Sequence, residues 1–263
     1  MLTMGVDIGS TACKCVILED GTEIAAKAVV PLGTGTKGVN EVVEIALKLA
    51  NVQRSELALV YVTGYGRFNF PEADGQRSEL SCHAKGMKFM VPDVRTIVDI
   101  GGQDVKVLSL APNGQMINFI MNDKCAAGTG RFLDVMAGIL DKKTSELGDI
   151  DAKAKEVASI SSTCTVFAES EVISKLSANV PLPDLVAGIH ASVAKRVAGL
   201  VFRAGVVQKV AMSGGVALNK GVVRALEKEI HSEIIILDDC QIIGALGAAL
   251  YAYHEIMKPK NKE

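Results

Sequence analysis

The 263-residue sequence contains no tryptophan and only 4% aromatic residues, which is too few for the stacked aromatic platforms that bind single-stranded nucleic acid. It also lacks a strong excess of either charge, because its formal net charge is −2 at pH 7. Proteins whose main partner is a polyanion usually have a basic surface and a high pI. We therefore expect no nucleic-acid partner.

The hydrophobic and charged residues also form no pattern typical of a secretion signal or of a membrane-spanning segment. The N-terminus has no basic stretch and reaches an acid at Asp7. The longest apolar run, Ile242 to Tyr253, is too short to cross a bilayer. The sequence thus predicts a cytoplasmic protein without a membrane partner. Its six cysteines are then expected to be reduced thiols or metal ligands rather than disulfides.

Two common nucleotide-binding motifs do not account for the glycines. The chain has no Gly-Lys dipeptide and therefore no P-loop. The segment from Gly33 to Gly38 satisfies G-x-G-x-x-G, but the next strand ends in Val62-Thr63-Gly64, without the acid that would bind a ribose. We interpret this segment as a turn and a helix start, near the phosphates of a nucleotide, rather than as a dinucleotide site.

The most informative feature that is present is a repeat. Asp7-Ile8-Gly9 aligns with Asp99-Ile100-Gly101, and Lys14 aligns with Lys106 at the same spacing. Each copy lies in a β-rich stretch with tight turns. The expected strands are Leu2–Ile8, Cys13–Leu18 and Glu23–Val30 in the first copy, and Val94–Ile100, Val105–Leu110 and Gln115–Ile120 in the second. The repeat predicts two related domains.

The remainder is mostly helical by its apolar periodicity. Helices are expected at Val39–Ala50, Leu80–Met90, Arg131–Leu140, Val166–Leu176, Asp184–Ala204, Lys220–Lys228 and Gln241–Ile256, with strands at Leu57–Thr63, Lys209–Met212 and Glu233–Leu237. We therefore predict an α/β protein of two domains. The first comprises residues 1–95 together with a returning C-terminal helix at about 241–258, and the second comprises residues 96–240.

The two glycine turns, facing each other, would form a phosphate cleft, because glycine lets backbone N–H groups approach an anion. Asp7 and Asp99 end the first strand of each copy and can hold Mg²⁺ through water. Ser10 and Thr11 add hydroxyl donors. A third glycine-rich element, Ser213 to Asn219, follows a strand and opens a helix, where adenosine and the α-phosphate would be favoured.

Two cysteines lie in segments that open helices. Cys125 precedes a turn of small residues and a helix, and Cys164 lies among hydroxyl residues at the start of another helix. N–H groups at helix starts stabilise negative sulfur. Two thiols are half of the usual four-cysteine shell of an iron–sulfur cluster, which a two-fold homodimer would complete. From spacing alone, two buried helix-cap cysteines are an equal alternative.

The three glycine-rich elements, in this order, resemble the phosphate-1, phosphate-2 and adenosine motifs of the actin, heat-shock chaperone and sugar kinase superfamily. The segments NDKCAAGTGRF and SSTCTVFAESE are similar to those of one family within it, the activators of (R)-2-hydroxyacyl-CoA dehydratases, which are BadF/BadG/BcrA/BcrD-type ATPases. Further similar segments are DIGSTACK, TGYGR, DIGGQDVK, SGGVALN and GALGAALYAY. The resemblance extends from Met4 to Tyr253.

The resemblance implies a two-domain actin-like ATPase fold, built from duplicated ribonuclease H-like domains with a nucleotide cleft between them. It implies a homodimer with one [4Fe-4S] cluster, held by Cys125 and Cys164 of each chain. The cluster would take one electron from reduced ferredoxin or flavodoxin. Binding and hydrolysis of ATP, with Mg²⁺, would then drive that electron to the dehydratase.

Site residues follow from the motifs and the resemblance together. Asp7, Asp99, Gln103 and Asp104 are the candidate catalytic residues, the last two for orienting the attacking water. The expected nucleotide contacts are Ser10, Thr11, Ala12, Cys13, Lys14, Gly101, Gly102, Gln103, Asp104, Lys143, Gly214, Gly215, Asn219 and Gln241. An activator of a benzoyl-CoA reductase, a small-molecule kinase of the same superfamily and a non-catalytic nucleotide switch are the alternative functions.

Overall fold

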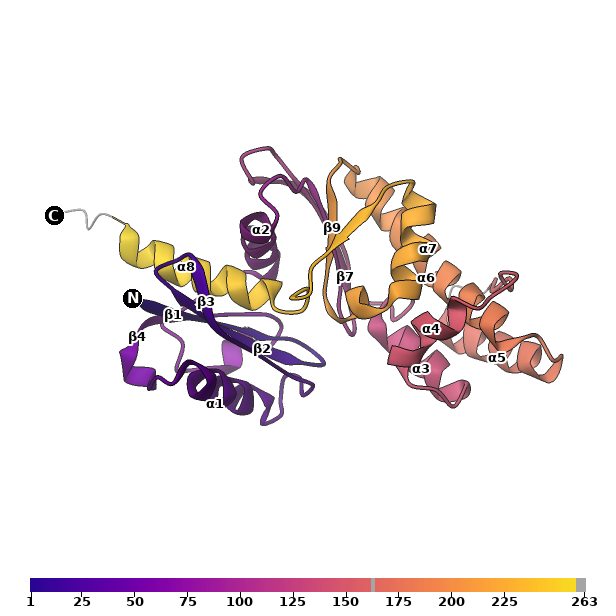
Figure 1. Ribbon diagram of the computed structural model, residues 1–263, viewed down its shortest axis with the longest axis horizontal. Helices are drawn as coiled ribbons and strands as arrows, with labels where there is room; N and C mark the ends of the chain where they lie inside the picture. Colours follow the sequence, from indigo (N-terminus) through magenta and orange to yellow (C-terminus); the bar gives the residue numbers. More distant parts are fainter. Residues whose placement is uncertain (162–163, 259–263) are drawn as a thin grey trace. The chain divides into compact units, whose positions relative to one another are not determined.

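The computed structural model describes residues 1–161 and 164–258, and these form two compact units. The first unit is Met1–Asp93 with Gln241–Glu263, and the second is Val94–Cys240. The hydroxyl residues expected beside Cys164 at positions 162 and 163, and the charged tail from 259 onward, lie outside the described residues. Figure 1 labels the helices and strands of both units.

The first unit is built on a mixed five-stranded sheet in the order β3-β2-β1-β4-β5. Its strands are β1 (Leu2–Ile8), β2 (Cys13–Glu19), β3 (Glu23–Val30), β4 (Leu57–Thr63) and β5 (Gly75–Gln76). The first three are antiparallel neighbours, whereas β4 runs parallel to β1. Helix α1 (Gly38–Ala50) covers one face of this sheet, and α8 (Ile243–Met257) covers the other, with α2 (Glu79–Met90) packed on α8.

Small residues let α8 pack backbone against backbone. A Cβ atom on Gly5 of β1 would lie 1.9 Å from the carbonyl oxygen of Ala245. A Cβ atom on Gly247 of α8 would lie 1.9 Å from the carbonyl oxygen of Cys82. No real side chain fits at such distances, so these glycines set how closely α8 approaches β1 and α2.

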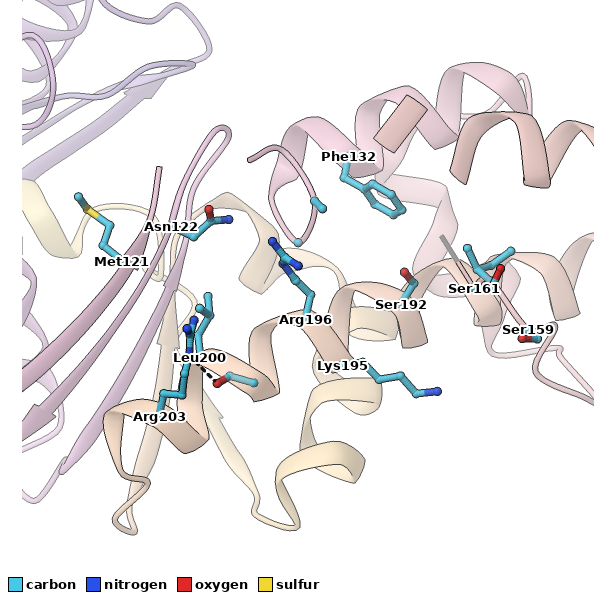
Figure 2. Close-up of a pocket in the computed structure, with 14 residues that line it drawn as sticks. Met121, Asn122, Phe132, Ser159, Ser161, Ser192, Lys195, Arg196, Leu200 and Arg203 are labelled. Carbon is cyan, nitrogen blue, oxygen red and sulfur yellow. Dashed lines mark hydrogen bonds between the residues drawn. The ribbon is translucent and has the colours of Figure 1, made fainter. Parts of the chain in front are cut away.

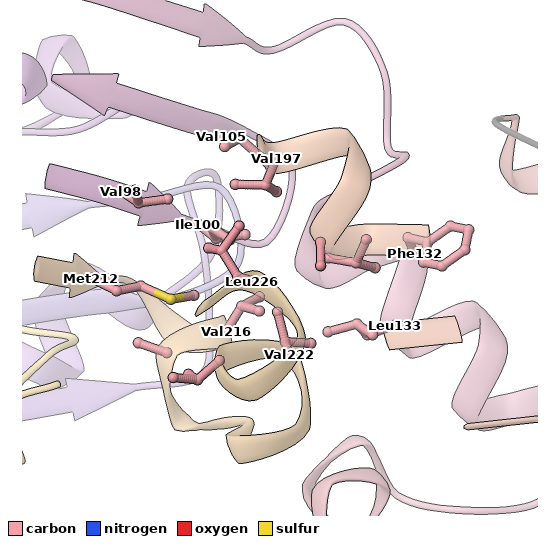
Figure 3. Packing of buried hydrophobic residues seen from close by; sticks show 14 of the residues in the cluster. Val98, Ile100, Val105, Phe132, Leu133, Val197, Met212, Val216, Val222 and Leu226 are labelled. Carbon is pink, nitrogen blue, oxygen red and sulfur yellow. The ribbon is translucent and has the colours of Figure 1, made fainter. Parts of the chain in front are cut away.

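The second unit repeats the sheet, in the order β10-β9-β6-β7-β8. Its strands are β6 (Thr96–Ile100), β7 (Val105–Leu110), β8 (Met116–Asn122), β9 (Val210–Ser213) and β10 (Ile234–Ile236). Its helices are α3 (Gly130–Ile139), α4 (Leu147–Asp151), α5 (Thr165–Ser177), α6 (Leu182–Ala204) and α7 (Lys220–Ile230). One core joins the sheet to α3, α6 and α7, and Figure 3 shows some of its side chains, among them Val98, Phe132, Val197 and Leu226.

Helix α6 is long and apolar enough to cross a membrane by length and composition. However, 67% of its most apolar stretch is buried inside the unit. Residues such as Leu185, Ile189 and Val193 belong to the core. Packing within the unit therefore accounts for the apolar character of this helix.

The expected strands and helices are all found, with bounds that shift by a few residues. One correction concerns the last helix, which begins at Ile243 rather than at Gln241, so Gln241 lies in the turn before it. The sequence analysis also missed the short elements β5 and α4. Both are too short to show a period, and tertiary contacts stabilise them.

The close contact of α8 with α2 makes a testable prediction. Gly247→Ala should lower the free energy of unfolding by about 1–3 kcal/mol, because the new methyl group collides with the backbone of Cys82. The matched control is Gly138→Ala in α3, where a Cβ atom meets nothing within 4 Å. That variant should gain about 0.5–1 kcal/mol, since alanine favours a helix. Urea unfolding followed by circular dichroism compares the two, and equal midpoints would contradict the packing.

Candidate functional site

The first glycine turn joins β1 to β2 and holds a buried carboxylate at its base. Asp7 lies opposite Lys14 in the antiparallel register, and the Lys14 Nζ donates to Asp7 Oδ2 at 3.1 Å. The amide of Gly9 donates to the carbonyl of Ala12 at 3.1 Å and closes the turn. Asp7 is only 2% exposed, whereas Thr11 at the tip is exposed. The turn therefore presents backbone and hydroxyl groups outward, above a buried ion pair.

The second turn, between β6 and β7, has the same construction. Asp99 lies opposite Lys106, and the Gly101 amide donates to the Asp104 carbonyl at 2.9 Å. Lys106 is 1% exposed, and its Nζ contacts both Asp99 Oδ2, at 3.4 Å, and Asp104 Oδ2. Gln103 is exposed at the tip. The repeat found in the sequence is thus a repeat of hydrogen bonds and strand register.

The repeat continues into the parallel neighbouring strand, which the sequence analysis did not notice. Thr63 pairs with Asp7, and Ser213 pairs with Asp99, in the same relative register. Each is followed by a glycine with φ of +87°, Gly64 in one unit and Gly214 in the other. Such a φ favours glycine, and a Cβ atom at either position would lie within 2.5 Å of a backbone oxygen. In both units a glycine turn therefore packs closely beside the carboxylate.

The two carboxylates differ in one respect that bears on a metal ion. The hydroxyl of Ser213 donates to Asp99 Oδ1 at 2.7 Å. Among the side chains that the structure describes, Asp7 Oδ1 is a buried oxygen with no hydrogen-bond partner. A buried carboxylate oxygen normally has one, because desolvation without compensation is costly. A hydrated cation such as Mg²⁺ fits this oxygen.

Each glycine turn is also hydrogen-bonded to the segment that opens the following helix. In the first unit, the Thr34 amide donates to the Gly9 carbonyl at 2.9 Å, so the Gly33–Gly38 segment packs on the first glycine turn. In the second unit, the amides of Gly130 and Arg131 donate to the carbonyls of Gly101 and Gly102, at 2.9 and 2.8 Å. The latter bonds attach the N-terminus of α3 to the second turn.

The third glycine-rich element runs from the end of β9 into α7. Asn219 is the N-cap of α7, and its side-chain oxygen accepts from the amides of Gly221 and Val222. Its amide nitrogen contacts His190 Nε2 at 3.3 Å, and His190 Nδ1 lies 2.5 Å from Asp151 Oδ2. The side chain of Asn219 is thus used inside the unit as a helix cap, and its contact with a nucleotide remains a prediction.

The His190 and Asp151 side chains were not predicted from the sequence. His190 is fully buried in α6, and Asp151 ends α4, which the sequence analysis missed. Burial would raise the pKa of Asp151, but its bonds to His190 and Arg224 hold that pKa below its usual value. No local pattern could pair residues 39 positions apart, so only the fold reveals this network.

The six cysteines divide into two groups. Four are buried, and burial raises their pKa, to about 11 for Cys13 and Cys240 and to about 12 for Cys82. Burial likewise raises the pKa of Cys15. Cys125 is partly exposed, in the loop between β8 and α3, and Cys164 is exposed as the N-cap of α5. These two thiols are the ones available to a soft metal centre.

A model of the BadF/BadG/BcrA/BcrD ATPase family matches residues 4–252. This chain belongs to that family. The 2-hydroxyisocaproyl-CoA dehydratase activator of Clostridioides difficile is 58% identical over 100% of this chain and 98% of the relative. The (R)-2-hydroxyglutaryl-CoA dehydratase activating ATPase of Acidaminococcus fermentans is 55% identical over 97% of this chain and 98% of the relative.

A solved structure of this family gives the same fold. The activator of the 2-hydroxyisocaproyl-CoA dehydratase from Clostridium difficile, solved with bound ADPNP, matches with a TM-score of 0.96 and 57% identity, covering 100% of both chains. The predicted family and the actin-like α/β fold are therefore confirmed.

The remaining sequence-predicted residues lie in turns and loops of the two units. Ser10 and Ala12 are partly exposed in the first turn, next to Cys13, whose side chain packs in the core and leaves only its backbone for a ligand. Lys143 is exposed ahead of a short 3-10 helix, and Gln241 is partly exposed before α8. Their contacts with a nucleotide remain predictions.

The Asp151–His190 pair gives a pH-dependent prediction for this family member. A carboxyl whose folded pKa is depressed contributes stability above its unfolded pKa, and that contribution is lost as pH falls through the folded value. Asp151→Asn should therefore lower the free energy of unfolding by about 1–3 kcal/mol at neutral pH, with a smaller deficit in acid. Asp149→Asn, an exposed neighbour in α4, is the control. A loss of stability in Asp151→Asn that does not change with pH would contradict the stabilising role of the Asp151 carboxylate.

Proposed function

We propose that this chain is the ATP-driven electron-transfer activator of a 2-hydroxyacyl-CoA dehydratase. The relatives at 58% and 55% identity are named as a dehydratase activator and a dehydratase activating ATPase, and both are covered nearly in full. The acyl group is chosen by the dehydratase and is left open. A cytoplasmic location, a homodimer and reduction by ferredoxin or flavodoxin are parts of the same proposal.

One pair of hydrogen bonds supports this function above all other contacts. The amides of Gly130 and Arg131 bind the Gly101 and Gly102 carbonyls, and Cys125 lies only five residues before Gly130. A phosphate held at Gly101–Gly102 is therefore one hydrogen bond away from the cysteine loop. A change at the turn can reach the thiol without any phosphoryl acceptor, provided that the nucleotide binds the two arrangements differently.

In the proposed nucleotide-binding role, the glycine turns would contact different parts of the nucleotide. The Ser10–Thr11 and Gly102–Gln103 tips would donate to the phosphates, and the Gly214–Gly215 turn, between β9 and α7, would contact the adenosine. Asp7 Oδ1 would accept from a water of hydrated Mg²⁺. Asp104, held by Lys106, would orient the attacking water together with Gln103.

Cys125 and Cys164 would hold half of a [4Fe-4S] cluster, and the same pair in a second copy would complete its shell. Such a cluster supplies a one-electron redox centre. The Asn122 amide donates to the Cys125 carbonyl at 2.9 Å and fixes the loop. The exposed side chains of Val166 and Phe167, beside Cys164, offer apolar surface for the second copy.

The kinase and benzoyl-CoA reductase alternatives are weaker. A kinase would leave the two accessible thiols without a role, whereas an activator uses both. The two relatives at 55–58% identity are both named for dehydratases. We therefore favour dehydratase activation as the function of this chain.

The proposal is tested by removing each thiol. Cys125→Ser and Cys164→Ser should lose most of the iron and sulfide found after anaerobic purification, and should lose activation of the dehydratase, because each removes a ligand. ATP binding should stay within a few-fold of the parent, since neither residue lies in a phosphate turn. Iron analysis, a nucleotide-binding titration and a coupled dehydratase assay measure these three properties.

Cys15→Ala is the matched control, because Cys15 is buried in the core of the first unit. It should keep the iron of the parent protein. Full iron content in either Cys125→Ser or Cys164→Ser would refute the ligand assignment. A parent protein without iron after anaerobic reconstitution would refute the electron-transfer function itself.

A further inference from the structure

A groove of about 820 Å³ lies within the second unit, beside both cysteine segments (Figure 2). One wall is the end of β8 and the loop after Cys125, including Asn122 and Gly128. The segment that leads toward Cys164 contributes Ser161, and α6 forms the other wall. Nothing in the proposed reaction uses this groove.

The charged side chains that line the groove are all positive. Lys195, Arg196 and Arg203 of α6 line it, and no Asp or Glu is among the residues that do. Lys195 and Arg196 are exposed and make no ion pair with the part of the chain that the structure describes. Arg203 Nε donates to the Gly199 carbonyl at 3.3 Å, as the dashed line in Figure 2 shows. In a chain of net charge −2, this is a local basic surface.

The basic side chains lie close to the predicted cluster ligands. Gly128 is three residues after Cys125, and a Cβ atom on it would lie 3.1 Å from Cγ of Arg196. The Arg196 stem therefore packs on the cysteine loop. The Asn122 amide, on the same wall, is bonded to the Cys125 carbonyl. A partner bound in the groove would contact the backbone that carries this thiol.

Apolar side chains flank the groove. Met121 of β8 lines the groove and is 42% exposed, and Leu200 of α6 and Ile160 line it as well. A small anion would not need these residues. Large apolar side chains together with arginine are typical of protein interfaces, and charge complementarity then requires an acidic partner.

We propose that this groove docks the acidic protein that delivers the electron, the donor whose identity the proposed function leaves open. The inference rests on that proposed function. One electron would pass from the reduced flavin or iron–sulfur centre of the donor to the cluster that Cys125 and Cys164 would hold, without transfer of a proton or a group. The cations would steer an acidic surface toward the cysteine loop and hold it there.

The test uses the anaerobically purified full chain with its cluster, and reduced flavodoxin as the probe. The variant replaces all three cations, as Lys195→Gln, Arg196→Gln and Arg203→Gln together. Lys195→Glu with Arg203→Glu is a second variant that keeps the packing of Arg196 on Gly128. The control is Lys228→Gln, an exposed cation in α7 that does not line the groove. Stopped-flow absorbance measures the second-order rate of cluster reduction, and calorimetry measures binding of oxidised flavodoxin.

At low salt both groove variants should react at least about tenfold more slowly with flavodoxin and bind it more weakly, and high salt should abolish the difference. Reduction by dithionite, iron content and the dimer should be unchanged, as should all properties of the control. An unchanged flavodoxin rate would overturn the proposal. Dissociation of a groove variant to monomers would also overturn the proposal, because it would assign the groove to a second copy. Loss of dehydratase activation alone, with an unchanged flavodoxin reaction, would overturn it as well.

Failure of the underlying function would look different. If dithionite does not reduce the parent protein, or if the parent holds no iron, the electron-transfer function itself fails before any donor is added. The two results are therefore distinguishable in one set of samples.

Discussion

Two main-chain hydrogen bonds, from the amides of Gly130 and Arg131 to the carbonyls of Gly101 and Gly102, are the constraint on which this account depends. They fix the start of α3 to the second glycine turn, and so fix the loop that carries Cys125. Because backbone groups make these bonds, the geometry does not depend on a particular side chain. In the proposed function, a phosphate that displaces the turn would therefore act on the start of α3, where the cysteine loop ends.

The same architecture appears twice and has diverged at this point. In the first unit, the Gly9 carbonyl accepts from Thr34, and the chain proceeds to α1 through a short turn. In the second unit, the equivalent carbonyl of Gly101 accepts from Gly130, at the end of a loop with a partly exposed cysteine. In the first copy, Asp7 Oδ1 is buried without a hydrogen-bond partner among the described side chains, whereas in the second copy Ser213 donates to the corresponding oxygen of Asp99.

Much of this was predictable from the sequence, because the decisive signals are local. The Asp-Ile-Gly repeat, the strand periods and the Asn219 cap each lie within a few residues. The His190–Asp151–Asn219 network, the basic groove along α6 and the contact of α8 with Cys82 were not predictable. Each joins residues that are distant in sequence. In the histidine network and in the contact of α8 with Cys82, the histidine and the glycine also lie at positions that hydrophobic periodicity does not distinguish from ordinary core positions.

The proposed coupling is tested most directly by the reduction potential of the proposed cluster, measured by an EPR-monitored titration with ADP and then with a non-hydrolysable ATP analogue. If the turn is coupled to the cysteine loop, the potential or the EPR signal must differ between the two nucleotides. A shift of about 59 mV would correspond to about 1.4 kcal/mol of differential stabilisation for this one-electron couple. Identical potentials and signals with both nucleotides bound would contradict the coupling.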